Sequence, residues 1–452
     1  MTGQAPVAQR CTIVLPSSGA FDSRTWRIAG SLAGRGHDVT VVARLEPGLP
    51  AEESHPDGYR IVRVPVSAVD GLPRLLRGPV RRFRQERGRG SPSAVRGAGG
   101  PARSAPGGAG SAGRRGPVAR IRAGLAAVVR LAAIALTVRS QRLAARSVAP
   151  PADLVHAMAY MGIPIGLDLA GRDAAAAIYD ARDIYVDAAN LARLPGPARR
   201  LFGRAERRWA RRATRVVTVN EPYAAVMADR WGVVRPLVVM NCSPAPAGSV
   251  ERGRRFHERL GLAPATRVVL YQGGFSRDRG IEQLVAALRE LDPGVALVLL
   301  GYGALQAELE AAAARPEVAG RLFVLPAVPP AELLGWVGSA DVVAMPIQPS
   351  TLNHRLTTPN KLFEAMASGV PVVASDLPGM AGIVRETGCG VLCDPTSAAS
   401  IAAAIRSILE APDAERAAYG ERALAAVRDR YNWEAQTAIL LAEYGRLTGR
   451  PW

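Results

Sequence analysis

Lysine is almost absent from this sequence. Among 57 lysine and arginine residues, Lys361 is the single lysine, so nearly all positive charge is carried by guanidinium groups. Arginine presents a planar fork of donors and lysine a compact point charge, so the two are not equivalent at a binding site. The position that retains an ammonium group is therefore a candidate functional residue, and an ordinary surface lysine is the alternative.

Cysteines are few, and long apolar runs are missing. The four cysteines show no metal-type spacing and fit a reducing cytoplasm. No uninterrupted run of 18 apolar residues occurs, which predicts no membrane span. The stretch Met1 to Arg10 lacks the apolar core of a signal peptide. The sequence thus predicts a cytoplasmic protein that binds no metal.

Positive charge is concentrated in one segment. Residues 71–147 contain 17 arginines against one acid, Glu86, and so carry +16 of the chain's net charge of +18. Residues 81–116 are rich in Arg, Gly, Pro and Ala, which predicts disorder, whereas residues 117–147 are predicted to form a helix. Three roles stay open for this basic segment: contact with an anionic membrane surface, a solvated linker, or a helix packed on the domain. Nucleic-acid binding is not expected, because stacking aromatics are missing.

The rest of the sequence alternates strands and helices, which indicates an α/β fold of two doubly wound, Rossmann-like domains facing across a cleft. The first domain is predicted at 1–245 and contains the basic segment as an insert. A linker is expected at 245–265, and the second domain covers 246–430. A C-terminal helix in 431–452 is expected to pack back on the first domain. The predicted strands are 10–17, 38–44, 59–66, 153–159, 176–183, 215–221, 236–242, 267–275, 295–303, 321–328, 341–347 and 371–375.

The stretch around Lys361 is typical of a helix followed by a buried strand. Thr358 is the predicted N-cap and Gly369 the C-terminal stop. Asn360, Lys361 and Glu364 fall on the polar side of this helix, close to its N-terminus. Because a helix N-terminus favours anions, a phosphate-bearing ligand is expected to place its phosphates at Lys361 and its sugar hydroxyls at Glu364.

Small and polar residues follow several predicted strands, at the sheet edge where ligands of open α/β sheets bind. Backbone N–H groups of glycine-rich turns can approach an oxyanion, and Arg279 adds a full positive charge. In the second domain these ligand-binding candidates are Gly273, Gly274, Ser276, Gly301, Tyr302 and Gly303; in the first domain they are Gly19 in the opening turn and, as acceptor-side candidates, His156, Arg182 and Asp183.

The run Pro359–Glu364, followed by Gly369–Val373, resembles glycosyltransferase family 4 of the GT-B fold. The resemblance covers residues 10–66 and 153–445, nearly everything except the basic segment. It implies transfer of a sugar from a nucleoside-diphosphate donor, with retention of anomeric configuration and without metal or cofactor.

The resemblance also implies roles for single residues. Glu364 matches the carboxylate that holds the donor ribose, and Arg279 stands where the family usually has a diphosphate-binding lysine. Together with Lys361 these two are the predicted catalytic residues. Three positions depart from the family pattern: Gly274 replaces an arginine, Leu356 a glutamate and Arg182 a histidine.

Other functions stay open beside sugar transfer. One is a nucleotide-sugar epimerase. Another is a pyridoxal-phosphate phosphorylase in which Lys361 forms a Schiff base with the cofactor. A lysine on an exposed polar side of a helix is badly placed for that role. A third is a non-catalytic nucleotide-sugar-binding protein. For the transferase, a glycan or lipid-linked acceptor of polysaccharide biosynthesis is expected, with the enzyme in the cytoplasm or peripheral on the inner face of the plasma membrane.

Overall fold

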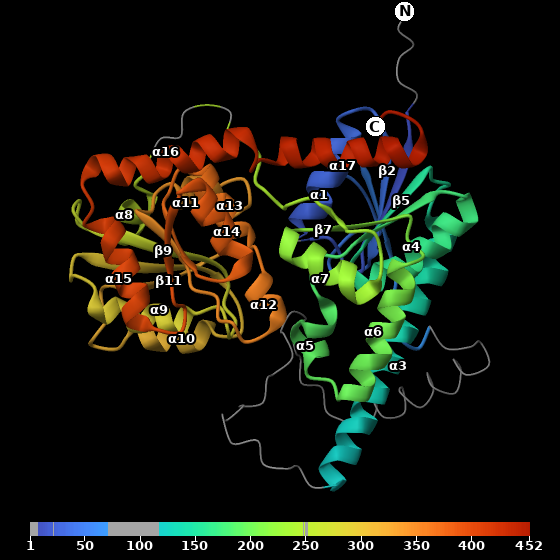
Figure 1. The fold of residues 1–452 in the computed structure, drawn as a ribbon, viewed down its shortest axis with the longest axis horizontal. Coiled ribbons are helices and arrows are strands. Elements are labelled where there is room, and N and C mark those ends of the chain that lie inside the picture. The colour runs from blue at the N-terminus through green and yellow to red at the C-terminus, as the bar shows by residue number, and fades with distance from the viewer. Residues whose placement is uncertain (1–7, 21, 71–116, 247, 249–251) are drawn as a thin grey trace, which may run out of the picture. The chain divides into compact units, whose positions relative to one another are not determined.

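A computed structural model describes residues 8–20, 22–70, 117–246, 248 and 252–452, with the backbone alone at 117–123 and 189–190. The segment 81–116, predicted to be disordered, lies outside the described residues. The chain divides into two compact units (Figure 1). Unit 1 comprises Met1–Thr218, Ala224–Leu237 and Leu440–Trp452, and unit 2 comprises Val219–Tyr223 and Val238–Ile439.

The sheet of unit 1 has eight strands in the order β3-β4-β2-β1-β5-β6-β7-β8. Neighbouring strands from β4 to β7 pair in parallel, which confirms the predicted doubly wound fold. The edge strand β3 is antiparallel and was not predicted, because its residues are mostly polar. The strands are β1 (Arg10–Val14), β2 (Asp38–Arg44), β3 (Glu52–Ser54), β4 (Arg60–Val64), β5 (Leu154–Met158), β6 (Ala176–Asp180), β7 (Arg215–Thr218) and β8 (Leu237–Val238).

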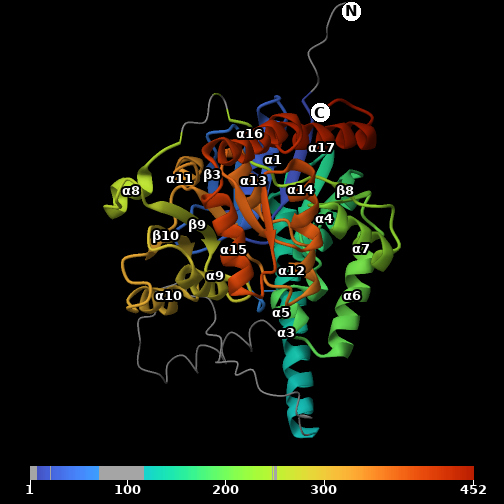
Figure 2. The ribbon, with the colours of Figure 1, turned by 60° about the vertical axis from the view of Figure 1, so that its left-hand side comes forward.

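Helices α1, α3, α4, α6 and α7 accompany this sheet (Figures 1 and 2). The predicted helix after the basic low-complexity stretch is confirmed as α3, and it packs on α4 and α6. Its C-terminal part enters the core, where Gln141 donates to the carbonyl oxygen of Leu15 at 2.9 Å and Ala145 is buried; nearer the N-terminus, Ala127 is buried as well. The helices are α1 (Ser23–Ala33), α3 (Pro117–Val148), α4 (Ala159–Asp173), α5 (Ala189–Ala192), α6 (Gly196–Ala210) and α7 (Glu221–Trp231), with a 3₁₀ turn η1 at Tyr185–Asp187.

Within the described part of the chain, one helical stretch, Gly124–Val148 of α3, is long and apolar enough to cross a membrane by length and composition alone. The sequence criterion of an uninterrupted apolar run missed this stretch, because Arg130, Arg139, Arg142 and Arg146 interrupt it. A core helix of a soluble protein meets the same test, so the finding by itself does not assign a membrane span.

The sheet of unit 2 has six strands in the order β11-β10-β9-β12-β13-β14, and all neighbours pair in parallel. Alternate residues of β9 serve opposite faces: Val268 and Leu270 belong to one buried cluster with the apolar side of α13, and Val269 and Tyr271 to another with α9 and α15. The strands are β9 (Arg267–Gly274), β10 (Val295–Tyr302), β11 (Leu322–Pro326), β12 (Val342–Met345), β13 (Val372–Ser375) and β14 (Gly390–Cys393).

One helix and one strand of unit 2 depart from the sequence prediction. The predicted linker 245–265 contains a helix, α8, whose Phe256 is buried in the unit 2 core. Strand β14, around the two neighbouring cysteines, was missed. The helices are α8 (Arg255–Leu260), α9 (Ile281–Ala287), α10 (Gln306–Ala313), α11 (Leu333–Val337), α12 (Leu352–Leu356), α13 (Asn360–Ala367), α14 (Pro378–Thr387), α15 (Ala398–Leu409), α16 (Asp413–Asp429) and α17 (Trp433–Thr448), with η2 at Leu288–Glu290. Residues of α17 from Leu440 onward belong to unit 1.

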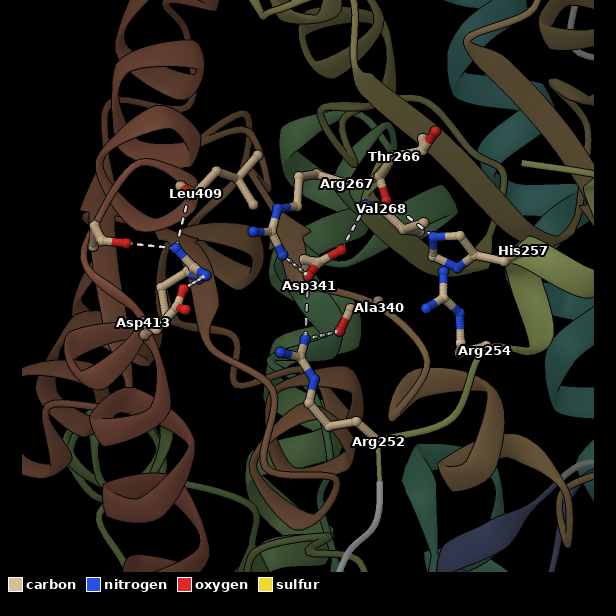
Figure 3. A network of polar contacts seen from close by, with 12 residues as sticks. Arg252, Arg254, His257, Thr266, Arg267, Val268, Ala340, Asp341, Leu409 and Asp413 are labelled. Carbon is tan, nitrogen blue, oxygen red and sulfur yellow. Dashed lines mark hydrogen bonds and ion pairs between the residues drawn. The ribbon is translucent and has the colours of Figure 1, made fainter. Parts of the chain in front are cut away.

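Asp341 ties the amino ends of β9 and β12 together (Figure 3). Its carboxylate accepts from the backbone N–H of Val268 at 2.8 Å and pairs with Arg267 at 3.3 Å. Arg252 donates to the carbonyl oxygen of Ala340 at 2.8 Å, which holds the chain entering unit 2 against the same edge. These contacts fix the register at the edge of the sheet opposite to the glycine turns.

A buried carboxyl group in unit 1 makes the stability of the fold depend on pH. Glu206 of α6 is 2% exposed and accepts from the hydroxyl of Tyr179 at 2.9 Å. Burial raises the pKa of Glu206 to about 8. The folded state thus binds a proton that the unfolded chain releases from about pH 4.5 upward, so this group lowers stability as pH rises through that window.

We therefore expect Glu206→Gln to flatten the loss of stability between about pH 5 and pH 8. The slope removed is up to about 1.4 kcal/mol per pH unit, the value for one proton. Urea unfolding at several pH values measures this slope, with the exposed Glu317→Gln as the matched control. An unchanged slope in Glu206→Gln would show that the carboxyl group is ionised in the fold.

Candidate functional site

Glycines lie at the carboxyl ends of two neighbouring strands of unit 2, as the last two residues of β9 and the last but one of β10. Gly273 and Gly274 of β9 pair with Gly301 and Tyr302 of β10. A Cβ at Gly301 would lie 2.0 Å from the carbonyl oxygen of Gly273, and a Cβ at Gly303 would lie 2.3 Å from that of Phe275. Gly301 and Gly303 are therefore explained by close backbone packing, without a ligand.

Gly273 and Gly274 have a different environment. Gly273 has φ +115°, and its nearest neighbour is the Nζ of Lys361, which would lie 3.5 Å from an added Cβ. Gly274 is exposed, and an added Cβ there would meet no atom within 4 Å. The hydroxyl of Tyr271 donates to the carbonyl oxygen of Gly274 at 3.0 Å. The Gly273–Gly274 turn is thus fixed by a hydrogen bond from Tyr271 and exposed at Gly274.

Lys361 lies in the first turn of α13 and reaches this turn. Its Nζ is 3.6 Å from the centroid of the Tyr271 ring, and the side chain is half-buried. The prediction of an exposed lysine on a polar helix side is therefore wrong. The apolar side of α13 is anchored by buried Leu362 and Phe363, and this packing turns Lys361 toward the end of β9.

The helix starts one residue later than predicted. Its N-cap is Pro359, and Thr358 is buried in unit 2, where its hydroxyl donates to the carbonyl oxygen of Gly379 at 2.8 Å. The side-chain amide of Asn220 donates to the Thr358 hydroxyl at 3.0 Å, which engages the group that would otherwise cap the helix. The predicted stop at Gly369 is confirmed, with φ +62° and the N–H of Val370 bonded to Ala365.

Glu364 lies one turn after Lys361 on α13. Its Oε2 accepts from the Nε2 of Gln272 at 3.2 Å, so the strand end and the helix orient the carboxylate together. Gln272 is 3% exposed, and its Oε1 has no hydrogen-bond partner within the described residues. Sequence reasoning missed Gln272; the available signal was a polar residue inside the apolar run that leads to Gly273.

Arg279 lies in the loop between β9 and α9 and is half-buried. Its guanidinium acts electrostatically on both Lys361 and Tyr271. No hydrogen bond or ion pair of this side chain occurs in the described part of the chain. The neighbouring Arg277, in contrast, is exposed and pairs with Glu282 and Glu308.

Burial and two neighbouring charges, those of Arg279 and Glu364, set the pKa of Lys361. Burial lowers the pKa of Lys361, Arg279 lowers it further and Glu364 opposes them, with a resulting pKa of about 7. The free ammonium is thus held at a cost that an approaching anion would relieve. Among the described residues, no group of three or more His, Cys, Asp or Glu side chains could hold a metal ion.

The other predicted residues of unit 2 lie around this centre. Ser276, Tyr302 and Asn360 are exposed, with Ser276 donating its N–H to the carbonyl oxygen of Gly274 at 3.1 Å. Within unit 2, the structure thus brings together Gly273, Gly274, Arg279, Lys361 and Glu364 at one sheet edge.

The remaining predicted residues, Gly19, His156, Arg182 and Asp183, belong to unit 1. Gly19 is buried in the turn after β1, with φ +83°. Arg182 donates to both carboxylate oxygens of Asp22 at 2.9 and 2.8 Å, and Asp183 is half-buried. His156 is fully buried, where the sequence suggested a side chain directed at a cleft.

The environment of His156 explains its burial. The ring contacts the hydroxyl of Tyr444 in α17 and Asp180 Oδ2 at 3.0 Å, and Asp180 also accepts from Arg24 Nε at 2.7 Å. Burial alone would raise the pKa of Asp180, but Arg24 and His156 hold it below its ordinary value. This network was missed because its members lie up to 288 positions apart in sequence.

Comparisons with known proteins agree with this geometry. Residues 254–425, which carry the whole unit 2 site, match the family model described as Glycosyl transferases group 1. A D-inositol 3-phosphate glycosyltransferase from Xylanimonas cellulosilytica is 34% identical over 227 residues, which span 49% of this chain and 52% of the relative. The chain thus matches about half the length of that relative.

Two solved structures align over nearly the whole chain. Sucrose-phosphate synthase from Thermosynechococcus elongatus has a TM-score of 0.67 at 20% identity and covers 98% of this chain and 99% of its own. Anabaena Alr3699/HepE in complex with UDP has a TM-score of 0.64 at 16% identity, and the alignment covers 97% of this chain and 100% of that chain. These likenesses confirm the predicted GT-B class, with two Rossmann-like units of parallel sheets.

The single lysine allows its protonation to be followed directly. After reductive methylation with ¹³C-formaldehyde, we expect the Lys361 signal in NMR spectra to titrate with a pKa of about 7, apart from the α-amino group. Arg279→Gln should raise this pKa and Glu364→Gln should lower it, whereas Arg277→Gln should leave it unchanged. Titration near pH 10 would show that the ammonium is solvated.

Proposed function

We propose that this protein transfers a glycosyl group from a nucleoside-diphosphate-sugar donor to an acceptor hydroxyl. The observation that carries the proposal is the convergence of Lys361, Arg279 and Glu364 on the open glycine turn of unit 2. The group 1 match over the same residues and the UDP-bound structural neighbour support it.

The site suits the charge that the reaction develops. The bond between the anomeric carbon and the diphosphate oxygen breaks, a bond to the acceptor oxygen forms, and the acceptor proton passes to the leaving phosphate. Negative charge then grows on the nucleoside diphosphate, where Lys361, Arg279 and the N–H groups at the start of α13 would stabilise it more in the transition state than in the ground state. Glu364, oriented by Gln272, would accept hydrogen bonds from the ribose hydroxyls.

Finer features are part of the same proposal. We propose that transfer retains the anomeric configuration and needs no cofactor beyond the donor. We propose a glycan or lipid-linked acceptor and a cytoplasmic enzyme at the inner face of the plasma membrane. The relative from Xylanimonas cellulosilytica is named a D-inositol 3-phosphate glycosyltransferase, and a phosphorylated acceptor is therefore one to test.

A thermal-shift screen against nucleoside diphosphates and their sugars tests the proposal, since a ligand of the native protein raises its melting temperature. We expect one nucleotide base to be preferred. Pyridoxal phosphate is included as a separate arm, because a half-buried lysine of lowered pKa could form a Schiff base. Stabilisation by pyridoxal phosphate and by no nucleotide would replace sugar transfer with phosphorylase-type chemistry.

Substitutions at the site should separate binding from catalysis. We expect Lys361→Ala to lower kcat/KM about ten- to hundredfold, corresponding to one charge-assisted contact of about 1.5–3 kcal/mol. Glu364→Gln should mainly weaken nucleotide affinity in calorimetry. Arg277→Gln, in the same loop but paired with Glu282 and Glu308, is the matched control. Wild-type kinetics in Lys361→Ala would contradict the assignment.

Nucleotide binding should also take up a proton. The pKa of Lys361 is about 7 in the free protein, and a bound diphosphate would raise it, so at about pH 8 binding should transfer up to one proton from buffer to protein. Affinity should accordingly fall as pH rises above 7. Calorimetry in buffers of different ionisation enthalpy measures the uptake, and Lys361→Met should abolish it. Equal binding heats in all buffers would refute the coupling.

A further inference from the structure

Helix α3 exposes apolar side chains where a soluble helix would carry polar ones. Leu125, Val128 and Val129 are 65%, 64% and 61% exposed. Their spacing places them on one side of the helix. In Figures 1 and 2 the N-terminal end of α3 extends beyond the other helices of unit 1. Leu125, Val128 and Val129 lie upstream of the buried residues Gln141 and Ala145, and Ala127 is buried between them. The exposed side chains therefore contribute little to the fold.

The neighbouring helix α6 exposes positive charge. Arg204, Arg208 and Arg211 are exposed at spacings of four and three residues, and the adjacent Leu201 is 60% exposed. The one acid of α6, Glu206, faces inward and is buried. The arginine side of α6 thus has no carboxylate of its own helix to neutralise it.

A hollow connects the two helices. A cavity of about 370 Å³ lies between α3, α4 and α6. Its lining includes Arg142, Arg146, Arg172, Arg212, Trp209 and Asp168. Asp168 pairs with Arg146 at 3.3 Å, and Arg172 is engaged by Asp173 and backbone carbonyls. Arg142 and Arg212 make no side-chain hydrogen bond or ion pair to any described residue, so their charges are available.

We propose that this surface of α3 and α6 docks unit 1 on an anionic lipid bilayer. Exposed leucine and valine beside arginine match the chemistry of a membrane interface, where apolar side chains enter the acyl boundary and guanidinium groups contact lipid phosphates. A nucleic-acid backbone would use the arginines but would leave the apolar side of α3 unexplained.

The helix lies at the bilayer surface and does not cross it. The C-terminal part of α3 is held in unit 1 by Ser140, Gln141 and Ala145, so only Pro117–Thr137 could enter lipid. Arg120, Arg122 and Arg130 fall within that stretch, and arginine is disfavoured at the centre of a bilayer. This inference uses none of the unit 2 site and does not depend on sugar transfer.

Co-sedimentation of the full chain with vesicles tests the proposal. We expect binding to vesicles of phosphatidylglycerol and phosphatidylcholine, and none to phosphatidylcholine alone. Exchange of Arg204, Arg208, Arg211 and Arg212 for glutamine should weaken binding at least about tenfold. A variant with the same loss of charge on exposed arginines of unit 2, Arg259, Arg289, Arg315 and Arg428, should bind like wild type.

A second variant reports on the apolar side. The triple variant Leu125→Gln, Val128→Gln and Val129→Gln should still bind anionic vesicles at low salt. At high salt, where charges are screened, it should lose the vesicle binding that wild type retains. Unchanged melting temperatures show that both variants fold. Equal vesicle binding of the α6 variant and the unit 2 control would overturn the proposal. The proposal would also be overturned if the variants bound vesicles like wild type but bound RNA more weakly. The same holds if they bound vesicles like wild type and a dimer of this chain dissociated.

Discussion

The unit 2 site depends on one unfavourable proximity: the ammonium of Lys361 is half-buried against Tyr271 while the guanidinium of Arg279 acts on it from the loop. Two like charges held together in a partly dry site repel each other, and Glu364 offsets this only in part. In the free protein this cost falls on the fraction of molecules in which Lys361 is protonated. Such preorganisation favours a ligand that brings more than one negative charge, as a diphosphate does.

The sheet provides the rigidity that this arrangement needs. From Val268 to Tyr271 the residues of β9 alternate between two buried clusters, and the strand then ends in Gln272 and two glycines. The ring of Tyr271 contacts the ammonium of Lys361, and Gln272 orients Glu364. Gly273, which has no side chain, leaves room for Lys361. Three consecutive residues of one strand, Tyr271, Gln272 and Gly273, therefore position the site, and the loop after β9 contributes Arg279.

Periodicity and turn residues were sufficient to predict most strands, most helices and two doubly wound domains, because parallel strands are continuous apolar runs bounded by glycine and polar residues. The GT-B class was predicted from the resemblance of the run Pro359–Glu364 to a known family. The N-cap of α13 was wrong because Asn220 and Gly379, distant in sequence, engage Thr358. The burial of His156 depends on Tyr444, and the half-burial of Lys361 on the ring of Tyr271. Contacts of this kind arise only once the chain is packed, so local sequence cannot report them.

The scarcity of lysine acquires a physical meaning from this packing. A guanidinium stays charged at any physiological pH, so an arginine at position 361 would have to carry a full charge beside Arg279 even with the site empty. An ammonium with a pKa of about 7 can instead shed its proton when no anion is present and regain it when one binds. Arginines such as Arg10, Arg230 and Arg321 are paired with acids or bonded to backbone carbonyls, where a permanent charge is accommodated. The one lysine thus occupies a position where the ability to lose a proton matters, which is a stronger reason for its identity than charge alone.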